Sequence, residues 1–317
     1  MRCSMMNKIL GILLLGLLYA LPVHAVDVRD KPEVRLKPYV LGATPAGNME
    51  AVVAAVRTAL KAQGFEEAGS YSPYAGATVI VVTSPELKVA AASDKLGGFG
   101  AGQRVAVTYY KGTLQVSYVN PMYLGAAYGL GSRLEVVATK LKAALGAVQE
   151  FGSVEGLTAE KLAPGHYHYM VGMPYFYQVD VLAKHADYQA ALATVVKGLA
   201  AEKGGTKKVY RIDLPGQQVS VFGVGIVSGD GIGKGDKDTD KEIMDILDWQ
   251  DLRITAALPY ELLVRGGEIV SLRGRFRIAL HTPDTKMAGA HGFTKIMSSP
   301  GGIKAALKEV AAGDKVK

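Results

Sequence analysis

The feature that most constrains the fold is an order of elements that occurs twice along the chain. Apolar residues recur at helical spacing over residues 48–63 and again over residues 187–202, so each half begins with a predicted amphipathic helix. Asn48 and Asp187 stand where helix N-caps are expected, and a glycine follows each helix. Short alternating runs come next in both halves and predict antiparallel strands, with glycine turns in YYKGTLQV and LVRGGEIV.

Each half then reaches a proline that follows a polar residue, Pro121 or Pro283, and closes with a second amphipathic helix. A repeated order of this kind predicts related units that bury their apolar faces together. The fold class we expect is α+β: two related lobes, each an antiparallel sheet with amphipathic helices on one face, packed as an internal pseudo-dimer. In that arrangement helix 48–63 superposes on helix 187–202, and the Pro121 turn superposes on the Pro283 turn.

The chain begins with a sequence typical of a cleavable secretory signal. Arg2 and Lys8 precede an apolar run over residues 9–21, and Ala25 ends a stretch that suits a signal peptidase. The run is shorter than a comfortable membrane span. We therefore predict a periplasmic or secreted protein without stable membrane insertion after cleavage. The only cysteine, Cys3, lies within the signal, so the mature chain would form no disulfide and no cysteine-bound metal site.

The predicted boundaries follow from these two patterns. They are a signal peptide at residues 1–25, a first α+β lobe at 26–147, a linker at 148–164, and a second α+β lobe at 165–317 with a Gly/Asp-rich insert near 225–250. A monomer is expected, because the pseudo-dimer lies within one chain. The formal charge of +7 is spread along the chain without a basic block. The sequence also lacks the alternation of basic and aromatic residues that is typical of nucleic-acid binding, so no nucleic-acid partner is expected. The partner we expect is a small-molecule or anionic ligand.

Two stretches carry a resemblance to a known family. VSYVNPMYLGAAYGL, a strand that ends in Asn-Pro before a short helix, and the closing FTKIMSSPGGIKAALKEVA resemble the domain-of-unknown-function 302 family, as two divergent tandem copies. The second copy departs from the pattern, because His281 to Asp284 stand where Tyr118 to Pro121 stand in the first. The resemblance implies a small α+β domain whose antiparallel sheet tends to pair with a second copy. It implies no known reaction.

The stretch HYHYMVGMPYFYQVDV, residues 166–181, alternates in the manner of one long strand. Its odd positions form an apolar and aromatic face that we expect in the core. His166, His168 and Met170 share the other face, and imidazole and thioether groups are ligands suited to copper. The alternatives are an ordinary polar face and a ligand pocket that uses the histidines as hydrogen-bond donors.

The stretch VSLRGRFRIALH, residues 270–281, also alternates and predicts a strand that buries Leu272, Phe276 and Ile278. The opposite face carries arginines that either bind an anion or lie in solvent beside glutamates such as Glu261 and Glu268. The proline turn of the first half gathers aromatic and amide groups, which indicate either a structural turn or a pocket at the sheet edge or between the copies. The candidate ligand-binding residues are Tyr118, Asn120, Tyr123, Tyr128, Arg273, Arg275, Arg277 and His281.

The Gly/Asp-rich insert completes neither a phosphate-binding loop nor an EF-hand, because the required Ser/Thr, Gly and Glu positions are not filled. It predicts a flexible surface loop followed by a short helix, with weak calcium binding through Asp236, Asp238 and Asp240 as the alternative for the loop. The sequence has no nucleophile elbow and no His-Glu-x-x-His helix. The function we favour is therefore a non-enzymatic binding or accessory protein with its site between the lobes. A periplasmic copper-handling protein is the first alternative, and an uncharacterised enzyme is the second.

Overall fold

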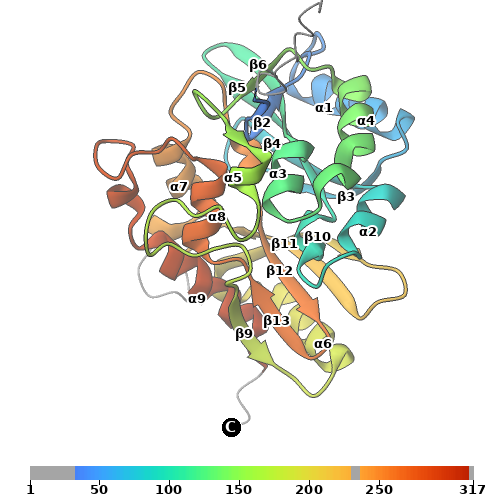
Figure 1. Cartoon of the computed structure of the whole chain (residues 1–317), viewed down its shortest axis with the longest axis vertical. Coiled ribbons are helices and arrows are strands. Elements are labelled where there is room, and N and C mark those ends of the chain that lie inside the picture. The colour runs from blue at the N-terminus through green and yellow to red at the C-terminus, as the bar shows by residue number, and fades with distance from the viewer. Residues whose placement is uncertain (1–32, 230–235, 314–317) are drawn as a thin grey trace, which may run out of the picture. The chain divides into compact units, whose positions relative to one another are not determined.

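The computed structural model describes residues 33–229 and 236–313 (Figure 1). The predicted signal peptide lies outside these residues, and so does the middle of the Gly/Asp-rich insert. The residues from Val34 on cluster as one compact unit, which is the unit described below. Within the described ranges, no helix is both long enough and apolar enough to span a bilayer.

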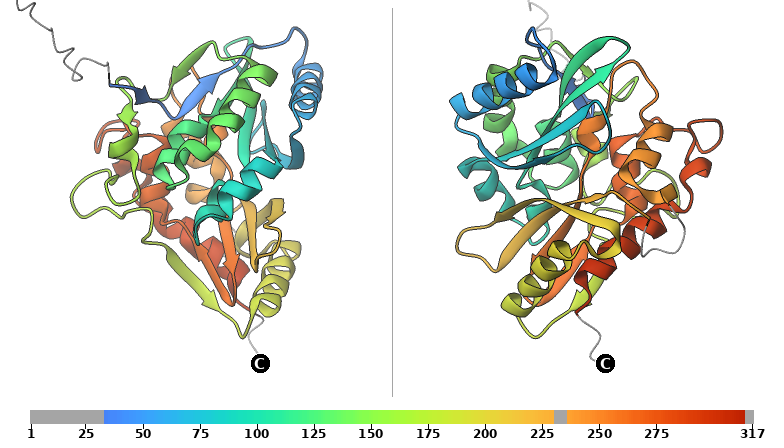
Figure 2. Two further views of the ribbon diagram at one scale, coloured as in Figure 1. Left: turned by 45° about the vertical axis from the view of Figure 1, so that its right-hand side comes forward. Right: turned by 180° about the vertical axis from the view of Figure 1, so that it is seen from behind.

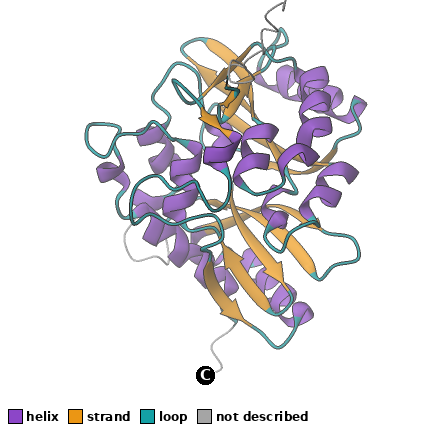
Figure 3. Cartoon of the chain, viewed as in Figure 1, coloured by secondary structure: helices purple, strands orange, loops and turns teal. Residues whose placement is uncertain are grey.

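The predicted α+β class is confirmed, because helices and antiparallel strands follow one another along the chain (Figure 3). The elements of the first half are β1 (Arg35–Leu36), β2 (Tyr39–Leu41), α1 (Met49–Ala62), β3 (Glu66–Tyr71), β4 (Ala77–Thr83), α2 (Pro85–Ala91), β5 (Gln103–Tyr110), β6 (Thr113–Val119), α3 (Pro121–Ala127), α4 (Glu135–Leu145), β7 (Gln149–Phe151), β8 (Leu157–Thr158) and α5 (Ala159–Leu162). The elements of the second half are β9 (Asp180–Lys184), α6 (Tyr188–Ala200), β10 (Thr206–Asp213), β11 (Val219–Ile226), α7 (Asp240–Leu247), β12 (Tyr260–Arg265), β13 (Glu268–Ser271), α8 (Gly274–His281) and α9 (Ser299–Ala311).

The first helix of each half lies where the sequence predicts it. The Asn48 side chain accepts a hydrogen bond from the Ala51 N–H at 3.0 Å, which caps α1. Asp187 caps α6 in the same way. Figure 2 shows α6 beside α9, and Gly198 permits their close approach, because a Cβ there would lie 2.4 Å from the Val310 carbonyl oxygen. The two glycine hairpins also form, as β5–β6 and β12–β13.

Eleven strands of the described residues form one sheet in the order β7-β2-β6-β5-β4-β3-β10-β11-β12-β13-β9. Counted outward from the central β3–β10 pair, the strands of each half follow the same spatial order. Its two middle strands come first, the hairpin follows, and the strand that precedes the first helix of the half, β2 or β9, lies beyond the hairpin. The order of helices between these strands also agrees, with α1, α2, α3 and α4 answering to α6, α7, α8 and α9. The strand order therefore repeats about the centre of the sheet.

Both central strands carry a bulge at the same place. The register of β3 shifts between Glu67 and Gly69, and that of β10 shifts between Lys208 and Tyr210. Gly69 and Tyr210 then pair with each other across the centre of the sheet. A bulge bends and twists the strand that carries it. Two bulges beside the central pair therefore favour a bend at the middle of the sheet.

The pairing register shows how far the sheet curls. One row of paired residues runs from Arg104 in β5 through the Gly69–Tyr210 pair to Glu261 in β12. In a flat sheet, five strand spacings of about 4.8 Å would separate the two ends of this row by roughly 24 Å. Arg104 and Glu261 instead form an ion pair. The sheet therefore curls until β5 and β12 face each other, and side chains from its inner face meet in the middle.

The two proline turns are not equivalent, so that prediction is wrong. Pro121 opens α3 directly after β6, whereas Pro283 follows the end of α8. In the order of elements, the position that answers to Pro121 is Gly274, the first residue of α8. The predicted linker, residues 148–164, holds β7, β8 and α5, and β7 adds a strand beside β2.

The long strand predicted over residues 166–181 does not form, and only β9 is extended at its end. Gly172 has a φ of +83° and Pro174 has no N–H to donate, so this stretch is a loop. Its odd positions are not a core face either, because Val171 is 93% exposed. Tyr167 and Phe176, one odd and one even, are the buried aromatic residues.

The strand predicted over residues 270–281 is also wrong, because β13 ends at Ser271 and α8 follows. Leu272, Phe276 and Ile278 are buried as predicted. The arginines nevertheless do not share a face. On a helix, side chains two residues apart point in different directions, so Arg277 is buried while Arg275 is exposed.

Candidate functional site

A cluster of charged side chains is buried where the two halves face each other. Arg104 of β5 forms an ion pair with Glu261 of β12, and the Nε of Arg277 lies 3.1 Å from the other carboxylate oxygen of Glu261. None of the three side chains is more than 3% exposed. Arg277 also donates to the carbonyls of Ala257 and Pro259, the latter at 2.8 Å. The cluster thus places two guanidinium groups around one carboxylate.

His281 completes this cluster, and its neighbours determine its tautomer. Its Nε2 lies 3.1 Å from a terminal nitrogen of Arg104, and a guanidinium can only donate, so this ring nitrogen carries no proton. The neutral ring then has its proton on Nδ1, which lies 3.0 Å from the Tyr39 hydroxyl, while that hydroxyl donates to the His281 carbonyl. Burial and the charges of Arg277 and Arg104 hold the pKa of His281 well below its usual value. His281 is neutral, with both nitrogens occupied.

Two tyrosines from the first half lie against the cluster. The Tyr123 hydroxyl donates to the Leu280 carbonyl at 2.8 Å. The Tyr128 ring stacks on Phe176 with ring centres 4.8 Å apart, and burial raises the pKa of Tyr128. Four of the predicted ligand-binding residues therefore come together between the halves: Tyr123, Tyr128, Arg277 and His281.

The other four candidate residues lie elsewhere. The Tyr118 hydroxyl donates to the Gly146 carbonyl at 2.9 Å, and Asn120 caps α3 by accepting from the Met122 N–H at 3.0 Å. Both are explained by their structural roles. Arg273 and Arg275 are exposed at the start of α8.

An open pocket of about 320 Å³ lies beside the buried cluster. Its lining residues come from the segments 247–254 and 281–292 and from Gly152, and His281 belongs both to the cluster and to the pocket. We call it the Trp249 pocket. Its size lies at the lower end of the range of small-molecule sites, which is roughly 300–1,000 Å³.

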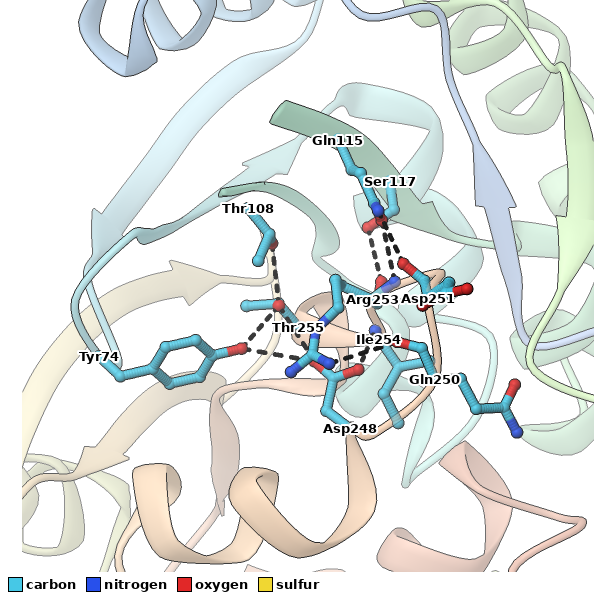
Figure 4. A network of polar contacts seen from close by, with 10 residues as sticks. All are labelled: Tyr74, Thr108, Gln115, Ser117, Asp248, Gln250, Asp251, Arg253, Ile254 and Thr255. Carbon is cyan, nitrogen blue, oxygen red and sulfur yellow. Dashed lines mark hydrogen bonds and ion pairs between the residues drawn. The ribbon is translucent and has the colours of Figure 1, made fainter. Parts of the chain in front are cut away.

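One wall of the Trp249 pocket is anchored on strands of the first half (Figure 4). The Gln115 amide of β6 donates to the Asp251 carbonyl at 2.7 Å and accepts from the Arg253 N–H at 3.0 Å. The Thr108 hydroxyl of β5 donates a hydrogen bond to the Thr255 hydroxyl at 2.9 Å. Apart from Gly152, the lining of the pocket therefore comes from the second half, and it rests on strands of the first half.

Asp248 lies at the start of this wall and is 2% exposed. One carboxylate oxygen accepts from the Ile254 N–H at 2.9 Å, and the other lies 3.3 Å from the Nε of Arg253 (Figure 4). Burial raises the pKa of Asp248 to about 6, although Arg253 acts in the opposite direction. Both oxygens are engaged by the protein.

Trp249 supplies exposed aromatic surface to the pocket. It is the only tryptophan of the chain, it is 51% exposed, and its ring stacks on His291 with centres 4.8 Å apart. Sequence reasoning missed this residue, because it lies at the end of the insert, after the predicted loop and short helix, where no binding motif was recognised. A lone tryptophan directly after an acidic helix is the signal that could have found it.

The insert is ordered by buried aspartates where a flexible surface loop was predicted, so that prediction is wrong for residues 236–242, whereas the short helix predicted after the loop forms as α7. Asp240 accepts a hydrogen bond from the Tyr71 hydroxyl at 2.8 Å, and burial raises the pKa of Asp240 to about 7. Asp238 accepts from the Ser298 hydroxyl at 3.0 Å, at the start of α9. These two carboxylates contact different elements, which argues against a shared calcium site. Residues 230–235 lie outside the described part of the chain.

The proposed copper ligands do not share a strand face, because that strand does not form. The Nδ1 of His166 lies 2.9 Å from the Glu160 carbonyl, and the Nδ1 of His168 lies 3.2 Å from the His166 carbonyl. Met170 is 47% exposed. In residues 33–229 and 236–313, no group of three or more His, Cys, Asp or Glu side chains could hold a metal ion.

Comparison of the chain with family models, with curated proteins and with solved structures gave no match. The resemblance to the domain-of-unknown-function 302 family therefore stays a prediction.

Proposed function

We propose that this chain is a secreted, non-enzymatic binding or accessory protein, and that its ligand occupies the Trp249 pocket. The observation that carries the proposal is the pocket itself, an opening of about 320 Å³ beside an exposed indole. Concave sites with a few polar groups and aromatic surface are typical of small-molecule binding. The compartment rests on the N-terminal sequence, and N-terminal sequencing of exported protein should find a start near Val26.

The position of the pocket fits an internal pseudo-dimer. The repeated strand order, the paired bulges and the meeting of Arg104 with Glu261 support two copies related by a pseudo-twofold axis. In a twofold interface, a residue near the axis meets its own counterpart. Arg104 and Glu261 lie at equivalent positions of the two copies, the same number of strands from the central Gly69–Tyr210 pair. Two equivalent positions near the axis face each other, and divergence of the copies has placed opposite charges there.

The state of the buried titratable groups supports binding over catalysis. A general base needs a free lone pair within reach of the substrate. In the two buried titratable groups of the pocket, both nitrogens of His281 and both carboxylate oxygens of Asp248 are already held by the protein, and the exposed His291 has its Nδ1 3.0 Å from the Ile246 carbonyl. The exposed ring of Trp249 favours a small polar ligand that itself contains a ring, because aromatic surfaces stack on such groups.

The experiment follows the fluorescence of Trp249 while sugars, nucleosides and aromatic amino acids are titrated into the mature protein. Because Trp249 is the single tryptophan, the tryptophan emission, excited selectively over that of the tyrosines, comes from the pocket alone. We expect one class to change the emission. Calorimetry should then show that Trp249→Ala abolishes binding, whereas Tyr109→Ala, which removes a 57% exposed aromatic of β5 outside the pocket, does not. Binding that survives Trp249→Ala would overturn the assignment of the site.

A further inference from the structure

A second pocket, of about 200 Å³, borders α8 and is almost wholly apolar. Seven of its eight lining residues are apolar, and the buried part of the wall comes from Ile278 and Ile296. Three of the seven are methionines from different parts of the chain: Met173, Met287 and Met297. We call it the methionine pocket. Methionine side chains are flexible and polarizable, and they are common at surfaces that adapt to apolar ligands.

Arg275 is the one charged residue of the methionine pocket. It precedes Ile278 by three residues on α8, so the two side chains lie on the same side of the helix. Its neighbours are engaged, because Arg273 lies 3.9 Å from Asp180 and Arg277 is buried against Glu261. Arg275 makes no hydrogen bond or ion pair with any part of the chain that the structure describes. Its guanidinium is thus free to bind an anion at the pocket.

The geometry points to a binding site for an amphiphilic carboxylate, with its apolar body in the methionine pocket and its carboxylate on Arg275. A guanidinium fork matches a carboxylate in shape and charge. The volume equals that of roughly seven water-sized groups, which suits a short aliphatic chain. This site is separate from the Trp249 pocket, so the inference goes beyond the function proposed above and can fail independently of it.

Three thioethers also suit copper(I), but the rest of the pocket disfavours a metal ion. Arg275 would repel a cation at short range in a partly desolvated site. The remaining lining residues, Ile278, Phe293, Ile296 and Pro300, offer carbon surface and no ligand atom. Apolar surface beside the Arg275 guanidinium therefore favours an amphiphilic anion over a metal ion.

The test uses octanoate as the probe and full-length mature protein labelled with carbon-13 at the methionine methyl groups. We expect octanoate to shift the methyl resonances of Met173, Met287 and Met297 while the fluorescence of Trp249 stays unchanged. Octylamine, which has the same chain with the opposite charge, should bind at least about tenfold more weakly. Arg275→Gln should weaken octanoate binding by about tenfold. Arg273→Gln is the matched control, because Arg273 is an exposed arginine two residues earlier that does not line the pocket, and it should leave binding unchanged.

A set of Met→Leu variants separates the two chemistries, because leucine keeps the volume and apolar character but removes the sulfur. We expect the triple variant of Met173, Met287 and Met297 to bind octanoate within about threefold of the wild type. The inference is overturned if octanoate and octylamine bind equally, if Arg275→Gln has no effect, or if neither probe binds. Stoichiometric copper(I) binding that the triple variant loses would overturn it in favour of a metal site.

Discussion

Replacing Glu261 with Gln should strongly destabilise the protein. The substitution keeps the shape of the side chain but removes the carboxylate that pairs with both Arg104 and Arg277. Removal of one partner from a buried ion pair costs about 3–5 kcal/mol, because the remaining charge stays buried without compensation. For a protein of this size, where 1 kcal/mol corresponds to roughly 2–4 °C, the melting temperature should fall by roughly 6–20 °C.

Urea unfolding followed by circular dichroism measures this loss, and calorimetry checks the melting temperature. Glu268→Gln is the matched control, because Glu268 also pairs with two cations, Lys184 and Arg265, but its side chain is 33% exposed. Exposed pairs contribute about 0–1 kcal/mol, so the control should change little. If Glu261→Gln costs no more than Glu268→Gln, the buried cluster does not hold the two halves together.

The remaining predictions concern other parts of the molecule. The pKa of Asp240 is raised to about 7 from an ordinary value of 3.8, so its contribution to stability is present below about pH 4 and is lost as the pH rises through about 7. Between pH 4 and pH 8 the unfolding free energy of the wild type should therefore fall by up to about 4 kcal/mol through this group, and Asp240→Asn should remove that fall. Urea unfolding at several pH values measures it, and an unchanged pH profile in the variant would contradict the assignment. Phe276→Ala should cost about 3–5 kcal/mol of unfolding free energy because it truncates a buried ring, whereas Arg275→Gln should be nearly neutral; equal losses would show that α8 is packed differently. Copper titration should reveal no stoichiometric site at His166 and His168, and a submicromolar site lost in both His→Ala variants would contradict this.

Local patterns predicted much of the fold. The helices that begin at Met49 and Tyr188 and both glycine hairpins form where spacing and turn residues place them, because their signals lie within a few residues. The region that became α8 was ambiguous. Leu272, Phe276 and Leu280 are four residues apart, a spacing that fits a helix face as well as alternate positions of a strand.

The candidate site was only partly predictable, because its contacts join residues that are distant in sequence. The interface between the halves was expected, and Tyr123, Tyr128, Arg277 and His281 do meet there. Arg104 and Glu261 are 157 residues apart and come together only because the sheet curls. No pattern within either half reports that curvature. The Trp249 pocket was missed for the same reason, since its wall is fixed by contacts with strands of the other half.

The most direct test of the proposed function is native mass spectrometry of the mature protein purified from its own host. The proposal predicts a mass above that of the polypeptide, by the mass of one small molecule. The excess should disappear on denaturation and should be absent from Trp249→Ala purified in the same way. An excess mass that persists in Trp249→Ala, or wild-type protein that carries no ligand and responds to none of the fluorescence probes, would contradict a binding function at the Trp249 pocket.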